Sequence, residues 1–104
     1  METPTTGSAL LQAMIATMLL CDRLRGSETR VLHSITRESL LVGKVRAKIS
    51  FTQLGELSGL TRPAAARAVK SLIEIGYVID DEGAWRLDLV CMMEATRGVL
   101  PEVL

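Results

Sequence analysis

The sequence contains few aromatic residues, only two cysteines and a single histidine, and each shortage narrows the kinds of protein it can encode. Aromatic residues make up 3% of the 104 residues, whereas apolar residues make up 48%. A core built from Leu, Val, Ile, Ala and Met is typical of packed helices. Cys21 and Cys91 have no further Cys or His at metal-ligand spacing, so the sequence predicts buried thiols and neither a zinc site nor a disulfide framework.

Catalytic groupings and long apolar runs are also missing. No base stands beside a nucleophile, and the chain has no set of paired carboxylates or metal ligands, so we expect neither an enzyme nor a bound cofactor or metal. The first residues carry no basic side chain ahead of the apolar run from Ala9 to Cys21, which spans 13 residues, fewer than the ~20 needed to cross a bilayer. These features predict a cytoplasmic protein with no membrane partner.

The formal net charge is zero, but the charges are unevenly distributed along the chain. Residues 44–70 carry six basic side chains against Glu56 alone, a net charge of +5. Residues 71–104 carry two basic side chains against seven acidic ones, a net charge of −5. Because a local basic surface can attract a polyanion even on a neutral molecule, residues 44–70 are the candidate binding region.

Two of the expected helices are apolar around most of their circumference. The first, residues 8–24 with Ser8 as its cap, and the last, residues 88–97, must each be covered on more than one side. We expect a second copy of the chain to cover them, and the alternative for the first helix is a central core position in a monomer. The predicted dimer contact comprises Leu10, Leu11, Met14, Ile15, Met18, Leu19, Met92 and Met93.

Capping signals divide the middle of the chain into further elements. Ser27 is expected to cap a helix that contains Val31 and Ile35, and residues 47–49 form a short β-compatible stretch. Residues 50–76 predict a helix-turn-helix, because Ser50 and Gln53 match a capping box and Thr61 can cap a second helix that ends at Gly76. Residues 77–87 predict a hairpin, with residues 77–79 and 85–87 as strands.

Two segments resemble a known family. GSETRVL (residues 26–32) and KISFTQLGELSGLTRPAAARAVKSLIEIGYV (residues 48–78) look like the amino-terminal domain of phage replication protein O and related phage and plasmid proteins. A more distant similarity is to repressors of the multiple-antibiotic-resistance regulator type. The resemblance implies a mainly α fold with a small β-hairpin: one winged helix-turn-helix domain over residues 1–104, with extra N- and C-terminal helices and residues 77–87 as the wing.

The resemblance also implies that the second helix of the pair is presented to the major groove of double-stranded DNA. Its expected reading surface comprises Thr61, Arg62, Pro63, Ala64, Ala66, Arg67 and Lys70. Related sequences carry Ser or Thr where Ala64 and Ala66 stand here, so specificity would depend on arginines and apolar contacts. Thr52, Gln53, Lys44, Arg46 and Lys48 are expected to contact phosphates. The alternative for the basic residues is an ordinary solvated helix face.

The predicted function is therefore sequence-specific binding of DNA by a homodimer, as a transcriptional repressor or replication-control factor of phage or plasmid type. The expected wing tip argues for a second reading, because Asp80, Asp81 and Glu82 would be repelled by phosphates. Related sequences also tend to be polar where Ile73 and Ile75 stand. The alternative is a winged-helix interaction module that binds a host protein through these residues.

Overall fold

The computed structural model describes residues 6–97, and the ends of the predicted domain, residues 1–5 and 98–104, lie outside the described part. Within residues 6–97 the chain is mainly helical with one antiparallel hairpin, as the sequence predicts. The elements are α1 (Thr6–Leu20), η1 (Cys21–Arg23), α2 (Gly26–Glu38), η2 (Leu40–Val42), α3 (Phe51–Ser58), α4 (Arg62–Ile75), β1 (Val78–Asp81), β2 (Ala84–Leu87) and α5 (Leu89–Thr96).

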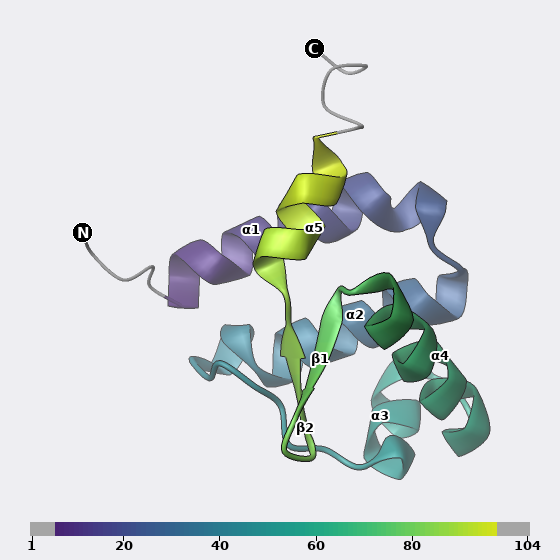
Figure 1. Cartoon of the computed structure of the whole chain (residues 1–104). Coiled ribbons are helices and arrows are strands. Elements are labelled where there is room, and N and C mark those ends of the chain that lie inside the picture. The colour runs from purple at the N-terminus through teal and green to yellow at the C-terminus, as the bar shows by residue number, and fades with distance from the viewer. Residues whose placement is uncertain (1–5, 98–104) are drawn as a thin grey trace.

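The helices are arranged in two groups that meet at α2 (Figure 1). Helix α1 packs against α5, and α3 packs against α4, while α2 contacts α1, α3 and α4. The hairpin follows α4, and its tip lies at the end of the molecule opposite α5 (Figure 1). This arrangement leaves one side of α4 facing away from the rest of the chain.

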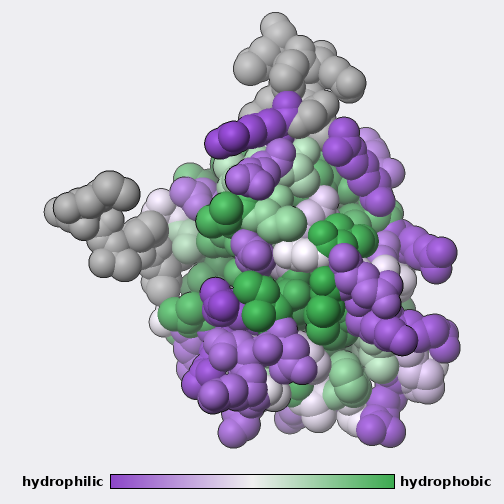
Figure 2. All heavy atoms as spheres, in the orientation of Figure 1, coloured by the Kyte–Doolittle hydropathy of each residue, from purple (hydrophilic) through white to green (hydrophobic). Residues whose placement is uncertain are grey.

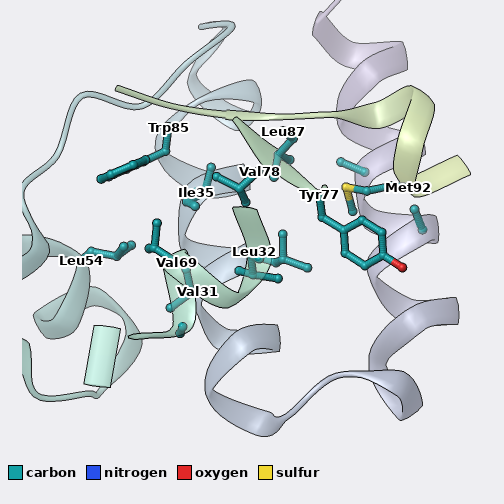
Figure 3. Packing of buried hydrophobic residues seen from close by; sticks show 14 of the residues in the cluster. Val31, Leu32, Ile35, Leu54, Val69, Tyr77, Val78, Trp85, Leu87 and Met92 are labelled. Atoms are coloured by element: carbon teal, nitrogen blue, oxygen red, sulfur yellow. The ribbon is translucent and has the colours of Figure 1, made fainter. Parts of the chain in front are cut away.

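The core consists mainly of aliphatic side chains collected around α2. Val31, Leu32 and Ile35 are fully buried and lie among side chains of α3, α4 and the hairpin (Figure 3). Tyr77, at the base of the hairpin, lies next to Met92 of α5 (Figure 3). The core therefore continues from the α3–α4 pair to the α1–α5 pair.

The starts of the first two helices differ from the sequence prediction. Helix α1 begins at Thr6, ahead of the predicted cap Ser8, and a 3-10 turn carries the chain from its end to Arg23. Helix α2 begins at Gly26, so Ser27 is not its cap. Instead, the backbone N–H of Arg25 donates to Oε1 of Glu28 at 2.7 Å. A carboxylate in the first turn thus satisfies the backbone donor of the residue that precedes the helix.

The α3–α4 pair has the predicted caps and a tight connection. The hydroxyl of Ser50 accepts from the N–H of Gln53, and Gln53 Oε1 accepts from the N–H of Ser50, which completes the capping box. Helix α3 ends at Gly59, with φ of 69°. At Gly55 the next turn of chain approaches closely, because an added Cβ would lie 2.7 Å from the carbonyl oxygen of Leu60.

The hairpin has longer strands and a shorter turn than the sequence predicts. Residues 80, 81 and 84 belong to the strands, and only Glu82 and Gly83 form the connection. Both connecting residues have positive φ, 55° and 84°, as a two-residue type I′ turn requires. The predicted stretch at residues 47–49 forms an isolated bridge between Ala47 and Trp85 instead of a full strand.

Helix α1 is covered on one side only, so it is not a central core helix of the described chain. Ala13, Ala16 and Leu20 are fully buried, whereas Leu11 and Met18 are 59% and 69% exposed. The other predicted contact residues on α1 are exposed, Met14 and Ile15, or half-buried, Leu10 and Leu19. Apolar residues also gather across the middle of the face that Figure 2 shows.

One residue of the predicted dimer contact is placed wrongly by the sequence analysis. Met92 is fully buried inside the chain, in the core cluster next to Tyr77, and cannot meet a second copy. Its neighbour Met93 is half-buried. Helix α5 therefore turns its Met92 side inward, and its most exposed apolar side chain is Val90 at 71%.

Candidate nucleic-acid interface

The outer face of α4 carries the cationic residues that the sequence singled out. Thr61 caps the helix, since its Oγ1 accepts from the N–H of Ala64 at 3.3 Å, and Pro63 stands in the first turn. The inner side is the predicted one, with Ala65, Ala68, Val69 and Leu72 buried. The outer residues are Arg62, Pro63, Arg67 and Lys70, which are exposed, and Ala64 and Ala66, which are half-buried.

Within the described part of the chain, the three cations on this face have no carboxylate partner. Within residues 6–97, the ion pairs join Arg37 to Glu38, Arg46 to Asp81 and Arg86 to Asp81. Arg62, Arg67 and Lys70 belong to none of these pairs. Their charges are thus uncompensated in the described part of the chain and are available to an anionic partner.

A part-buried hydrogen bond joins α4 to α2 on the other side. Glu28 is 5% exposed, and its carboxylate accepts a hydrogen bond from the hydroxyl of Ser71 on α4. Because Glu28 also receives the N–H of Arg25, it joins the start of α2 to the middle of α4. Local sequence patterns could not predict this contact, since the two residues lie 43 positions apart. The junction borders a cavity of about 200 Å³ that Arg67 also lines.

The start of α3 offers fewer free groups than the sequence suggests. Thr52 and Gln53 are both exposed, as expected of phosphate contacts. However, the side-chain oxygen of Gln53 is already bonded to the N–H of Ser50, so its amide NH₂ group is what can still donate. A buried contact, between the hydroxyls of Ser34 and Ser58 at 2.8 Å, holds α3 against α2.

The basic segment before α3, residues 44–48, passes beside the tip of the hairpin (Figure 1). Lys44, Arg46 and Lys48 are exposed and line an open groove of about 610 Å³. Arg46 differs from the two lysines, because its Nη1 lies 3.6 Å from Oδ1 of Asp81. The hydrophilic surface at the lower end of the molecule in Figure 2 covers this segment and the hairpin tip. The hairpin tip therefore meets basic residues of its own chain.

Two groups with shifted pKa values lie away from this interface. Burial, together with the nearby Cys91, raises the pKa of the Tyr77 hydroxyl above its usual value. Burial also raises the pKa of the Cys91 thiol, with Asp88 and Glu94 adding to the effect, so this thiol stays protonated near neutral pH. Both residues lie at the junction of the hairpin with α5, where Cys91 approaches Gly76.

No three His, Cys, Asp or Glu side chains within residues 6–97 come close enough together to hold a metal ion. None of the helices in the same range has the length and apolar character that crossing a membrane requires. Comparison of the chain with protein-family models, with curated proteins and with solved structures finds no match.

Proposed function

We propose that the chain is a sequence-specific DNA-binding protein of the winged helix-turn-helix type, acting in the cytoplasm as a homodimeric transcriptional repressor or replication-control factor. The observation that carries the proposal is the outer face of α4. Arg62, Arg67 and Lys70 are exposed there and, within residues 6–97, form no ion pair. A rigid helix that projects uncompensated cations suits entry into the major groove.

In the proposed complex the residues of α4 have separate tasks. Arg62, at the first turn, donates two hydrogen bonds to a guanine edge, and Arg67 and Lys70 contact bases or phosphates. Ala64 and Ala66 let the helix approach closely and touch thymine methyl groups. Lys44, Lys48 and Thr52 bind the phosphate backbone, which orients the protein without reading sequence.

The order of elements supports a winged helix as the frame for this surface. Helix α2 is followed by the Ala47–Trp85 bridge, the α3–α4 pair and the hairpin. In a winged helix the same order places the second helix of the pair outermost. The part-buried Glu28–Ser71 contact supports the proposal further, because it fixes the position of α4 on α2.

The apolar surface of α1 supports the proposed homodimer. Leu11, Met14 and Met18 are each more than half exposed, and η2, which packs against α1, adds Leu41 and Val42 at 56% and 58%. Together these side chains form an exposed apolar surface of the kind that marks a site of protein association. A two-fold dimer would present two copies of α4 to one palindromic site.

The test is a binding experiment on the Arg62→Ala/Arg67→Ala variant. A duplex is first selected from a random library by the wild-type protein, and both proteins are then titrated with it. Because the bidentate contact of Arg62 with guanine contributes roughly 1–3 kcal/mol and Arg67 adds a further contact, we expect the variant to lose affinity for the selected duplex by more than about fivefold. Its circular dichroism spectrum should match that of the wild type, since both side chains are exposed.

A matched control removes the same charge elsewhere. Arg23 and Arg97 are exposed and lie in η1 and at the end of α5, so the Arg23→Ala/Arg97→Ala variant should keep most of the affinity. Equal losses in the two double variants would mean that only net charge matters. Full binding by the Arg62→Ala/Arg67→Ala variant would refute the proposal.

One observation favours a second candidate function, recognition of a host protein. Ile73 and Ile75 on α4 are 38% and 43% exposed, so the described helices leave them partly open to solvent. Asp80 and Glu82 at the hairpin tip are exposed as well. A single stoichiometric protein partner, captured by the wild type and lost with Ile75→Asp, together with no salt-sensitive affinity for any duplex, would support this candidate.

A further inference from the structure

The hairpin tip carries a carboxylate that contacts two cations at once. Oδ1 of Asp81 lies 3.6 Å from Nη1 of Arg46, and its Oδ2 lies 3.5 Å from Nε of Arg86. In β1, Asp81 lies on the same face as Ile79, which pairs with Arg86 across the hairpin. Because Ala47 pairs with Trp85, Arg46 falls next to Arg86 on that face.

The backbone and the core hold this arrangement in place. Ala47 and Trp85 exchange two backbone hydrogen bonds, of 2.9 and 2.8 Å. The indole Nε1 of Trp85 donates to the carbonyl of Ile49 at 3.1 Å, and its ring stacks on Phe51 with centroids 5.4 Å apart. Arg46 is therefore kept near Asp81 by contacts that do not depend on the ion pair itself.

The pairing divides the cations of residues 44–70 into two sets. Arg46 is matched by Asp81, whereas the other five, which include the three on α4, have no carboxylate partner within residues 6–97. The exposed fractions of the Arg46 and Asp81 side chains are 51% and 34%, so water and ions reach the pair. Such half-exposed pairs are weak and can be displaced by a competing anion.

From this geometry we infer that Asp81 competes with phosphate groups for Arg46 and Arg86, and so limits sequence-independent binding. The inference rests on the proposed function, in that the phosphates are those of DNA. Affinity for any duplex grows with the number of cations that reach phosphates. Asp81 pairs with two of these cations, Arg46 and Arg86, so they are less available to phosphates. It does not pair with the cations on α4. The affinity for arbitrary duplexes falls as a result, and discrimination by the base-reading side chains rises.

The test compares Asp81→Asn with Glu82→Gln. Both changes remove one negative charge from the same end of the hairpin, but Glu82 belongs to none of the ion pairs within residues 6–97. Each protein is titrated with a random-sequence duplex at several salt concentrations. Because each additional phosphate contact adds about 0.9 to the salt slope, Asp81→Asn should steepen the slope by about one to two and raise low-salt affinity about three- to tenfold. Glu82→Gln should leave the slope unchanged.

The same two substitutions, made in a protein that lacks both arginines, separate the loss of the ion pairs from the loss of one negative charge. In the Arg46→Gln/Arg86→Gln protein the carboxylate has no guanidinium to withhold, so Asp81→Asn should change binding no more than Glu82→Gln does. The same steepening in this background would overturn the inference. Melting temperatures of all variants confirm that each is folded before binding is compared.

Elution from phosphocellulose, whose phosphates carry no bases, separates this inference from the proposed function. If Asp81→Asn elutes at higher salt than Glu82→Gln while no variant binds any duplex, the competition with phosphate stands and the DNA-binding proposal fails. If the wild type binds its selected duplex but Asp81→Asn and Glu82→Gln behave alike in both assays, the inference about Asp81 is wrong and the DNA-binding proposal stands.

Discussion

Glu28 shows how much one buried side chain contributes to the position of α4. Its carboxylate is bonded to the N–H of Arg25 and the hydroxyl of Ser71. Replacement by Ala leaves both donors without this acceptor, so Glu28→Ala should lower the free energy of unfolding by about 1–3 kcal/mol in a urea titration. Glu74→Ala, at an exposed position on α4, should change it by less than about 0.5 kcal/mol. Equal effects of the two substitutions would contradict the assigned role of Glu28.

Residues whose partners are close in sequence were predictable. Ser50, Thr61 and Gly76 act as the sequence indicates, because a cap bonds to backbone groups within about four positions. The partner of Arg46 was not predictable, since Asp81 is brought to it only by the bridge between Ala47 and Trp85. A basic residue in a basic stretch therefore turned out to be paired with an acid from another element.

At the scale of elements, the α3–α4 connection depends on a glycine inside a helix. A Cβ at Gly55 would lie 2.7 Å from the Leu60 carbonyl oxygen and 3.3 Å from Thr61, so the turn would have to move. Gly55→Ala should destabilise the protein by about 1–3 kcal/mol, although alanine is the better helix former. Thermal and urea unfolding measure the change.

Gly26 provides the matched control for this prediction. It also lies in a helix, but a Cβ there would meet nothing within 4 Å, so Gly26→Ala should be neutral or stabilise the fold by up to about 1 kcal/mol. A stabilising effect of Gly55→Ala would show that the turn adapts easily. The role of Gly55 could not be predicted from the sequence, because close approach of another segment leaves no mark on local periodicity.

At the scale of the whole molecule, the exposed side of α1 predicts self-association. Met18 is 69% exposed in the middle of an apolar surface, so Met18→Glu should place a charge inside the proposed interface. Sedimentation at micromolar concentration should then show monomers, whereas the wild type should sediment as a dimer. Ile73→Glu, on α4, should leave the dimer intact. A wild-type monomer under these conditions would disprove the homodimer.

The sequence could not tell which side of α5 faces the core. Residues 89–93 are all apolar or cysteine, so helical periodicity gives no direction, and Met92 was assigned to the surface although it is fully buried. Packing against α1 and Tyr77 decides the question, and both contacts are long-range. The strands of the hairpin are also longer than predicted. Glu82 and Gly83 form a two-residue turn, so Asp80 and Asp81 pair with the opposite strand instead of belonging to the connection.

Trp85 is the chain's one tryptophan, and it stands where the basic segment, the hairpin and α3 come together. Indole emission is therefore a built-in optical reporter of this junction, and no label has to be attached. Any event that pulls residues 46–49 off the hairpin must break the bond to Ile49 and open the ring to water. A shift of the emission maximum to longer wavelength would report that opening in the unmodified protein.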